Sequence, residues 1–180
     1  MGKILIVGTK RLEWLKDPLL RHLPGADVAK WMALDQTSTV IDMLNEASLM
    51  VFLNHAASLE GHTEQEAFDA FISGASRFKN LPWWEDSFWV PAELERSSTL
   101  DGGTTFIGSS PALLRELADL QALSPLDLGE PPRGYAEMPA GGASESFEET
   151  LSEQDCVKWI WRALHDGAHL AIEEYTMLAC

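Results

Sequence analysis

The fold is decided by residues 104–120, TTFIGSSPALLRELADL. Residues 104–107 predict a short buried strand, Gly108 a turn, and the residues after it a helix. Ser110 is expected to cap that helix, because its hydroxyl oxygen can accept a hydrogen bond from an unpaired N–H of the first turn, and Pro111 suits the first helical position. Four leucines share one face of this helix: Leu113, Leu114, Leu117 and Leu120.

The first third of the chain predicts three more strands. Residues 3–7 form an apolar run of strand length, and residues 27–34 and 49–53 are the other two candidates. Helices are expected between them. One is an irregular helix over residues 12–23, which contain Pro18. The other begins at Ser38 or Thr39 and has an apolar face of Val40, Ile41, Leu44 and Ala47.

The rest of the chain predicts two more helices and a closing strand. Residues 63–72 form the first helix, with Ala67, Phe68, Phe71 and Ile72 facing inward. The last helix begins at Ser152, and residues 176–179 form the strand. The stripe that the last helix turns to the sheet consists of Val157, Ile160, Trp161, Leu164, Ala168, Ala171, Ile172 and Tyr175.

Two loops interrupt this pattern. Residues 78–89 bring together Trp83, Trp84 and Trp89, which we interpret first as a cover over the core. Residues 124–150 form a loop rich in proline, glycine and acidic residues, and a connection this long is typically functional or mobile.

Alternating strands and helices predict an α/β fold with a mostly parallel sheet, because right-handed crossovers place helices on both faces. We expect a three-layer sandwich with a Rossmann-like or flavodoxin-like start, in a single domain over residues 1–180.

Acidic residues outnumber basic ones by 28 to 13, which gives a net charge of −15. Such a charge repels nucleic acid and attracts basic partners, although solubility alone is an alternative interpretation. Two cysteines favour a reducing compartment, and no apolar run approaches the roughly 20 residues that cross a bilayer. We therefore expect a cytoplasmic protein that binds neither nucleic acid nor membrane.

Three motifs suggest chemistry without completing a signature. Gly8 and Thr9 follow a strand, as in phosphate loops, but the required glycines are absent. Gly108, Ser109 and Ser110 resemble a nucleophile elbow that lacks the second glycine. His165 and His169, with Glu173 one turn further, have metal-ligand spacing, but they also suit the edge of an apolar helix face. We expect no metal, no cofactor and no catalytic residue.

Three stretches together resemble the small acidic immunity proteins that accompany bacterial polymorphic and secreted toxins. They are residues 89–94 (WVPAEL), 107–117 (IGSSPALLREL) and 161–172 (WRALHDGAHLAI). The resemblance covers about the C-terminal half of the chain. It implies a cytoplasmic, non-enzymatic inhibitor that binds its cognate toxin, and it carries over no catalytic residue.

Two functional hypotheses follow. The first is an acidic protein that binds a basic toxin domain through exposed aromatic and acidic side chains. Its candidate contacts are Trp83, Trp84, Glu85, Asp86, Glu130, Glu137, Glu145, Glu148 and Glu149. The alternative is a nucleotide-binding or hydrolytic enzyme with a ligand site at the carboxyl ends of the strands. That site would use Gly8, Thr9, Asn54, His55, Gly108 and Ser109.

Overall fold

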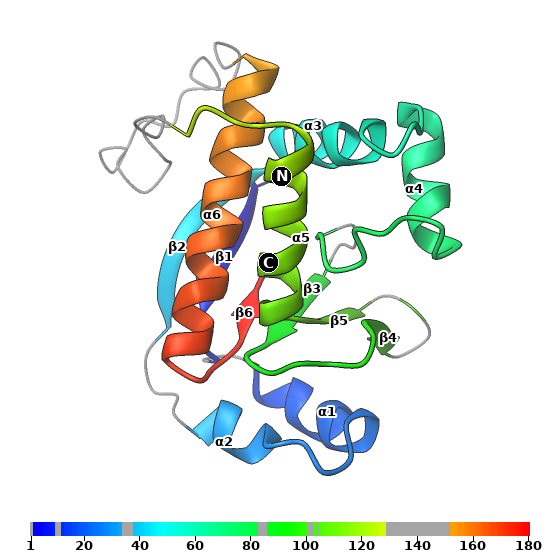
Figure 1. Ribbon diagram of the computed structural model, residues 1–180. Coiled ribbons are helices and arrows are strands. Elements are labelled where there is room, and N and C mark those ends of the chain that lie inside the picture. The colour runs from blue at the N-terminus through cyan, green and yellow to red at the C-terminus, as the bar shows by residue number, and fades with distance from the viewer. Residues whose placement is uncertain are drawn as a thin grey trace.

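A mixed β-sheet forms the centre of the computed structural model (Figure 1). The structure describes residues 2–9, 12–33, 38–82, 86–100, 103, 105–128 and 152–180. Within these residues the sheet has six strands in the order β2-β1-β6-β3-β5-β4. Their bounds are β1 (Gly2–Val7), β2 (Thr39–Asn45), β3 (Asp86–Val90), β4 (Ser98–Leu100), β5 (Thr105–Ser109) and β6 (Leu178–Ala179).

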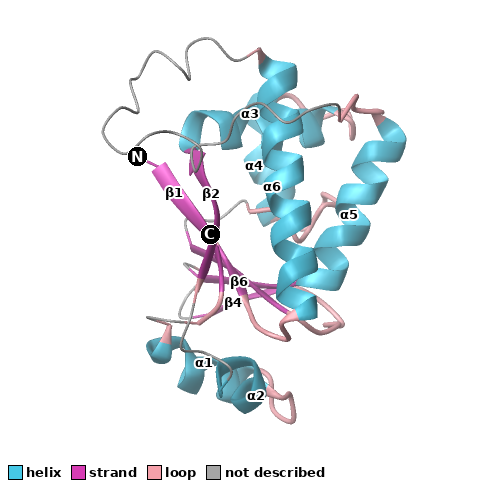
Figure 2. Ribbon diagram, turned by 90° about the vertical axis from the view of Figure 1, so that its left-hand side faces the viewer, coloured by secondary structure: helices cyan, strands magenta, loops and turns pink. Residues whose placement is uncertain are grey.

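Helices lie on both sides of this sheet (Figure 2). The 3-10 helix η1 (Glu13–Leu15) leads into α1 (Lys16–His22), and these two pack with α2 (Val28–Ala33) on one side. The other side carries α3 (Glu46–Ser58), α4 (Glu64–Ile72), α5 (Ser110–Leu123) and α6 (Glu153–Glu173). Strand β3 contributes to both cores, because Phe88 packs with the first group and Trp89 with the second.

The strand and the helix predicted within residues 104–120 are confirmed as β5 and α5, but the predicted turn at Gly108 is wrong, because Gly108 lies within β5. The cap is one residue earlier than expected: the Ser109 hydroxyl oxygen accepts the Ala112 N–H at 3.1 Å. The Ser110 hydroxyl is instead buried without a hydrogen-bond partner among the described residues. Gly108 permits close packing, because a Cβ there would lie 2.7 Å from Trp89 Cδ1 and 2.9 Å from Asn80 Oδ1.

The predicted mostly parallel sheet is wrong. Only β3 and β5 pair in parallel among the described strands, whereas β1 pairs antiparallel with β2 and with β6. The β3–β6 and β4–β5 pairs are also antiparallel. The error began with three segments. Residues predicted as strands form α2 and α3, and the helix predicted from Thr39 is strand β2.

The helices predicted over residues 63–72 and from Ser152 are both present. Helix α6 begins after Ser152, whose hydroxyl accepts the Asp155 N–H at 3.1 Å. Six residues of its predicted stripe are buried, from Val157 to Ala171, but Tyr175 lies beyond the helix and is 37% exposed. In α4 the helix is confirmed and its predicted inner face is partly wrong, because Phe68 and Ile72 are exposed.

The buried apolar residues form two clusters, one on each side of the sheet. The predicted loop residue Trp89 is a fully buried member of the larger cluster, and its indole N–H donates to the Asn80 carbonyl at 2.6 Å. In the part of the chain that the structure describes, no helix combines the length and apolar character needed to span a membrane.

Candidate functional site

A cavity of about 620 Å³ opens where α3, the start of α4, the end of α5 and the start of α6 meet. The packing of these helices brings residues from distant parts of the sequence together here. The described lining residues are Val51, Asn54, His55, Ser58, His62, Thr63, Glu64, Ser124, Pro125, Leu126, Glu153, Gln154 and Val157. Most of these side chains are polar, so the cavity is suited to a polar ligand or to a polar group of a partner.

Two lining residues carry buried polar atoms that lack a hydrogen-bond partner among the described residues. They are the Oδ1 atom of Asn54 and the Nε2 atom of His55. The Asn54 amide is oriented by its other end, since Nδ2 donates to Glu64 Oε1 at 2.9 Å. Burial lowers the pKa of His55, so its imidazole is neutral near pH 7. Unpaired buried polar groups of this kind typically indicate a missing ligand or solvent contact.

The helix starts that face the cavity are both capped from within their own sequences. At α4, the backbone N–H of Thr63 donates to Glu66 Oε2 at 2.9 Å, which holds the pKa of Glu66 below its usual range. At α6, Ser152 and Asp155 form the corresponding pair, with a Ser152 Oγ–Asp155 Oδ2 distance of 2.7 Å. First-turn carboxylates therefore already offset the positive ends of both helix dipoles.

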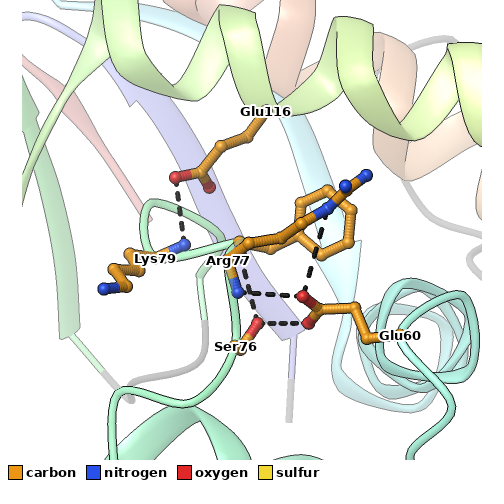
Figure 3. Close-up of polar contacts among 6 residues, drawn as sticks. Glu60, Ser76, Arg77, Lys79 and Glu116 are labelled. Atoms are coloured by element: carbon orange, nitrogen blue, oxygen red, sulfur yellow. Dashed lines mark hydrogen bonds and ion pairs between the residues drawn. The ribbon is translucent and has the colours of Figure 1, made fainter.

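A second polar arrangement fixes the segment of residues 76–80 (Figure 3). Glu60 accepts the Ser76 hydroxyl at 2.6 Å and the Arg77 N–H at 2.9 Å. On the other side, Glu116 accepts the backbone N–H groups of Lys79 and Asn80 at 3.0 and 2.7 Å. Two carboxylates from different parts of the fold thus hold the residues that lead toward Trp83, Trp84 and Glu85.

Asn80 connects this segment to the sheet. Its side-chain N–H donates to Glu116 Oε1 at 2.8 Å, and its Oδ1 accepts the backbone N–H of Ser109 at 3.0 Å. Burial raises the pKa of Glu116 to about 7, although the N–H groups of Asn80 and Lys79 act in the opposite direction. The Glu116 carboxyl therefore changes charge close to neutral pH.

Most of the predicted partner contacts lie outside the described residues. This applies to Trp83, Trp84, Glu85, Glu130, Glu137, Glu145, Glu148 and Glu149. Asp86 is the described member of the set, and it is exposed at the start of β3.

The six residues of the alternative ligand site are not gathered in one cavity. Asn54 and His55 lie on α3 and line the cavity, whereas Gly8, Thr9, Gly108 and Ser109 do not. Gly8 and Thr9 follow β1, and the Gly8 N–H donates to the Met177 carbonyl at 2.9 Å. Ser109 is buried and caps α5, which gives it a structural role.

The two histidines with metal-ligand spacing lie on α6 and stack with an aromatic ring. The His165 and Trp161 rings are 4.7 Å apart and nearly parallel, and His165 meets His169 edge to face at 4.5 Å. His165 also contacts Asp166 Oδ1 at 3.1 Å. Among the described residues, no group of three or more His, Cys, Asp or Glu side chains is placed to hold a metal ion.

Sequence reasoning did not find the cavity. It named Asn54 and His55 as the end of a strand, and it did not name Glu64 as a site residue. Glu153 and Gln154 lie far away in the sequence and reach the same cavity because α6 packs on α3. No spacing between the two segments indicates this contact, so only the fold brings the residues together.

Comparison with known proteins adds no assignment: no family model fits the chain, and neither a curated protein nor a solved structure matches it.

Proposed function

We propose that this protein is a non-enzymatic acidic binding protein with a basic protein partner, and that it acts in the bacterial cytoplasm as an immunity protein that neutralises a cognate toxin. The observation that carries the proposal is the exposed face of α4, defined by Glu64, Phe68, Asp69 and Ile72.

The α4 face combines apolar and acidic side chains. Phe68 is 48% exposed and Ile72 is 52% exposed, and the two residues are one helical turn apart. Glu64 lies one turn before Phe68, and the sequence of α4, EQEAFDAFI, contains no lysine or arginine. A large exposed aromatic ring beside carboxylates is typical of a surface that binds a protein with apolar and basic groups.

The charge of the whole chain supports the same partner chemistry. A net charge of −15 attracts a basic protein over several ångströms and raises the association rate before contact forms. The apolar pair would then supply most of the binding free energy once it is covered, because charges at the rim of an interface contribute less.

The competing hypothesis of a nucleotide-binding or hydrolytic enzyme has less support. It required a mostly parallel sheet whose strand ends meet at one site. The observed sheet is largely antiparallel, and only Asn54 and His55 of the six proposed residues line the cavity.

The proposal predicts that a basic toxin domain is encoded beside the gene for this protein, and the test uses that domain. We expect co-expression to restore growth and the purified proteins to bind, with an association rate that falls at least tenfold between 50 and 500 mM NaCl, about the range over which screening removes long-range attraction. Replacing both Phe68 and Ile72 by serine should weaken binding at least tenfold, which corresponds to about 1.4 kcal/mol.

Leu123→Ser provides the matched control, because Leu123 is a 48% exposed apolar residue on α5. This variant should bind and protect like the wild type. An unrelated basic protein should bind weakly at 50 mM NaCl and not at 500 mM. Wild-type affinity and protection in the Phe68→Ser, Ile72→Ser double variant would refute the α4 face, and failure of the toxin to bind at any salt concentration would refute the proposed function.

A further inference from the structure

The cavity beside α3 has the size of a small-ligand site. Its volume of about 620 Å³ lies within the roughly 300–1,000 Å³ that is typical of such sites. The charged side chains among its described lining residues are the carboxylates of Glu64 and Glu153, and none is a lysine or arginine. The charge of the cavity wall therefore favours a cation.

The N-termini of α4 and α6 lie at the cavity, but they do not change its preference for a cation. A free helix N-terminus attracts anions through its unpaired N–H groups. Here Thr63 with Glu66 and Ser152 with Asp155 already occupy such groups at α4 and α6. Acidic residues also fill both first turns, so an anion would meet carboxylates before it reached the backbone.

Two residues that line the cavity have acceptor atoms without a hydrogen-bond partner among the described residues. Asn54 Oδ1 is buried and unpaired among the described residues, while Asn54 Nδ2 already donates to Glu64. His55 Nε2 is also unpaired, and the neutral imidazole can accept a hydrogen bond there. A ligand that donates hydrogen bonds would satisfy atoms that the protein leaves without partners.

Two further observations define the kind of cation. The described residues contain no group of three His, Cys, Asp or Glu side chains that could hold a metal ion. The described lining residues also include no Phe, Tyr or Trp, which usually surround quaternary ammonium groups. What remains is a cation with N–H donors.

We infer that the cavity binds an organic cation with N–H donors, a guanidinium or primary ammonium group, between the carboxylates of Glu64 and Glu153 and beside Asn54 and His55. The group could belong to a free small amine or to an arginine or lysine side chain of a protein. The site shares Glu64 with the proposed α4 face, whereas the apolar contacts Phe68 and Ile72 of that face do not line the cavity.

The test titrates the full chain with matched probes and follows the imidazole Cε1–H signals by NMR. N-acetyl-arginine methylamide represents a side chain, agmatine represents a free amine, and N-acetyl-citrulline methylamide is the uncharged isostere of the first. We expect saturable shifts at His55 and His62 with the two cations, and at least tenfold weaker binding of the citrulline compound. His22, His165 and His169 lie outside the cavity lining and serve as internal controls.

Variants assign the binding to the carboxylates. Glu153→Gln and Glu64→Gln should each weaken cation binding at least fivefold. Glu173→Gln is the matched control, because Glu173 is an exposed glutamate at the opposite end of the same helix, α6. The Phe68→Ser, Ile72→Ser double variant should bind the cations like the wild type, which separates cation binding from the apolar contacts of the α4 face.

Each outcome decides the question. Tighter binding of agmatine than of the arginine compound supports a free amine as the ligand, and the reverse order supports a protein side chain. Absence of a saturable shift at His55 and His62 with both cations overturns the inference. Equal binding of the citrulline compound, or preferential binding of inorganic phosphate, overturns it as well.

Discussion

Burial and hydrogen bonds act in opposite directions on the pKa of the Glu116 carboxyl group. Three N–H donors from Lys79 and Asn80 favour the charged form, but loss of water outweighs them and raises the pKa of Glu116 to about 7. In an unfolded chain the same group has a pKa near 4.5. Folding therefore takes up a proton at Glu116 at any pH between these two values.

This difference predicts the pH dependence of stability. The native state binds more protons than the unfolded state between about pH 4.5 and 7, so the Glu116 contribution to the free energy of unfolding decreases as pH rises through that range and is constant above it. Glu116→Gln removes the titration. The free energy of unfolding of the wild type minus that of the variant, measured by urea denaturation, should therefore be more positive at pH 5 than at pH 8. A difference that does not change with pH would contradict this assignment.

Single residues also show where sequence reasoning reaches its limit. The pattern Ser-Ser-Pro correctly predicts a capped helix, but it cannot distinguish Ser109 from Ser110 as the cap, because either hydroxyl precedes a helical turn. Phe68 and Ile72 look like core residues by type, yet the inner side of α4 is filled by Ala67 and Ala70. Hydrophobic side chains are not excluded from the surface, so residue type alone does not identify the buried face.

At the scale of elements, β2 and α3 are the segments that the sequence misrepresents. Strand β2 begins with Thr39, Val40 and Ile41, which are β-branched residues that favour strands, but Ser38 and Thr39 also resemble a helix cap. Helix α3 contains the apolar run of residues 49–53. Such a run fits a buried strand or a buried helix equally well by periodicity. Helix α3 buries one face, which contains Leu49, Phe52 and Leu53, but the apolar Met50 on the opposite side is 46% exposed, so residue type alone does not mark the buried face.

One hydrogen bond ties β2 to α6, and its removal tests the arrangement. The indole N–H of Trp159 donates to Asp42 Oδ2 at 2.6 Å, and both residues are buried. Asp42→Leu leaves the indole N–H buried and unpaired, and Trp159→Phe leaves the carboxylate without this donor. We expect each variant to lower the free energy of unfolding by about 1–3 kcal/mol.

Combining the two substitutions provides the control for this prediction. The double variant should lose less stability than the two single variants together, because the hydrogen bond can be lost only once. Asp42→Asn should lose less than Asp42→Leu, because its amide oxygen can still accept. Additive losses, measured by denaturation, would show that Trp159 and Asp42 do not interact.

At the scale of the whole molecule, the net charge of −15 acts on stability as well as on binding. Like charges repel each other more in the compact state than in the unfolded chain. Raising NaCl from 0.05 to 0.5 M should therefore increase the free energy of unfolding, because screening shortens the range of this repulsion from about 14 Å to about 4 Å. NaCl and KCl should give equal increases. An increase with only one of them would indicate a specific ion instead of screening.

The candidate site could be predicted only in part, because it depends on how distant elements pack in the whole molecule. Asn54 and His55 were named from their place after an apolar run, although that run proved to be a helix. Glu64 and Glu153 join them through packing between elements that are distant in sequence, and a single sequence contains no direct signal of such contacts. The acidic character of the chain, by contrast, follows from composition and does not depend on topology.

The position of β6 has a consequence for self-association. Its two residues pair with β1 on one side and β3 on the other, and no other described strand connects the antiparallel β2–β1 pair to the β3–β5–β4 group. If β6 detached, the sheet would split and expose two new edges, each a template on which strands of other copies could add. The Gly8–Met177 hydrogen bond and the close packing of Leu178 on Gly167 hold β6 in place. These small contacts thus protect the protein from aggregation.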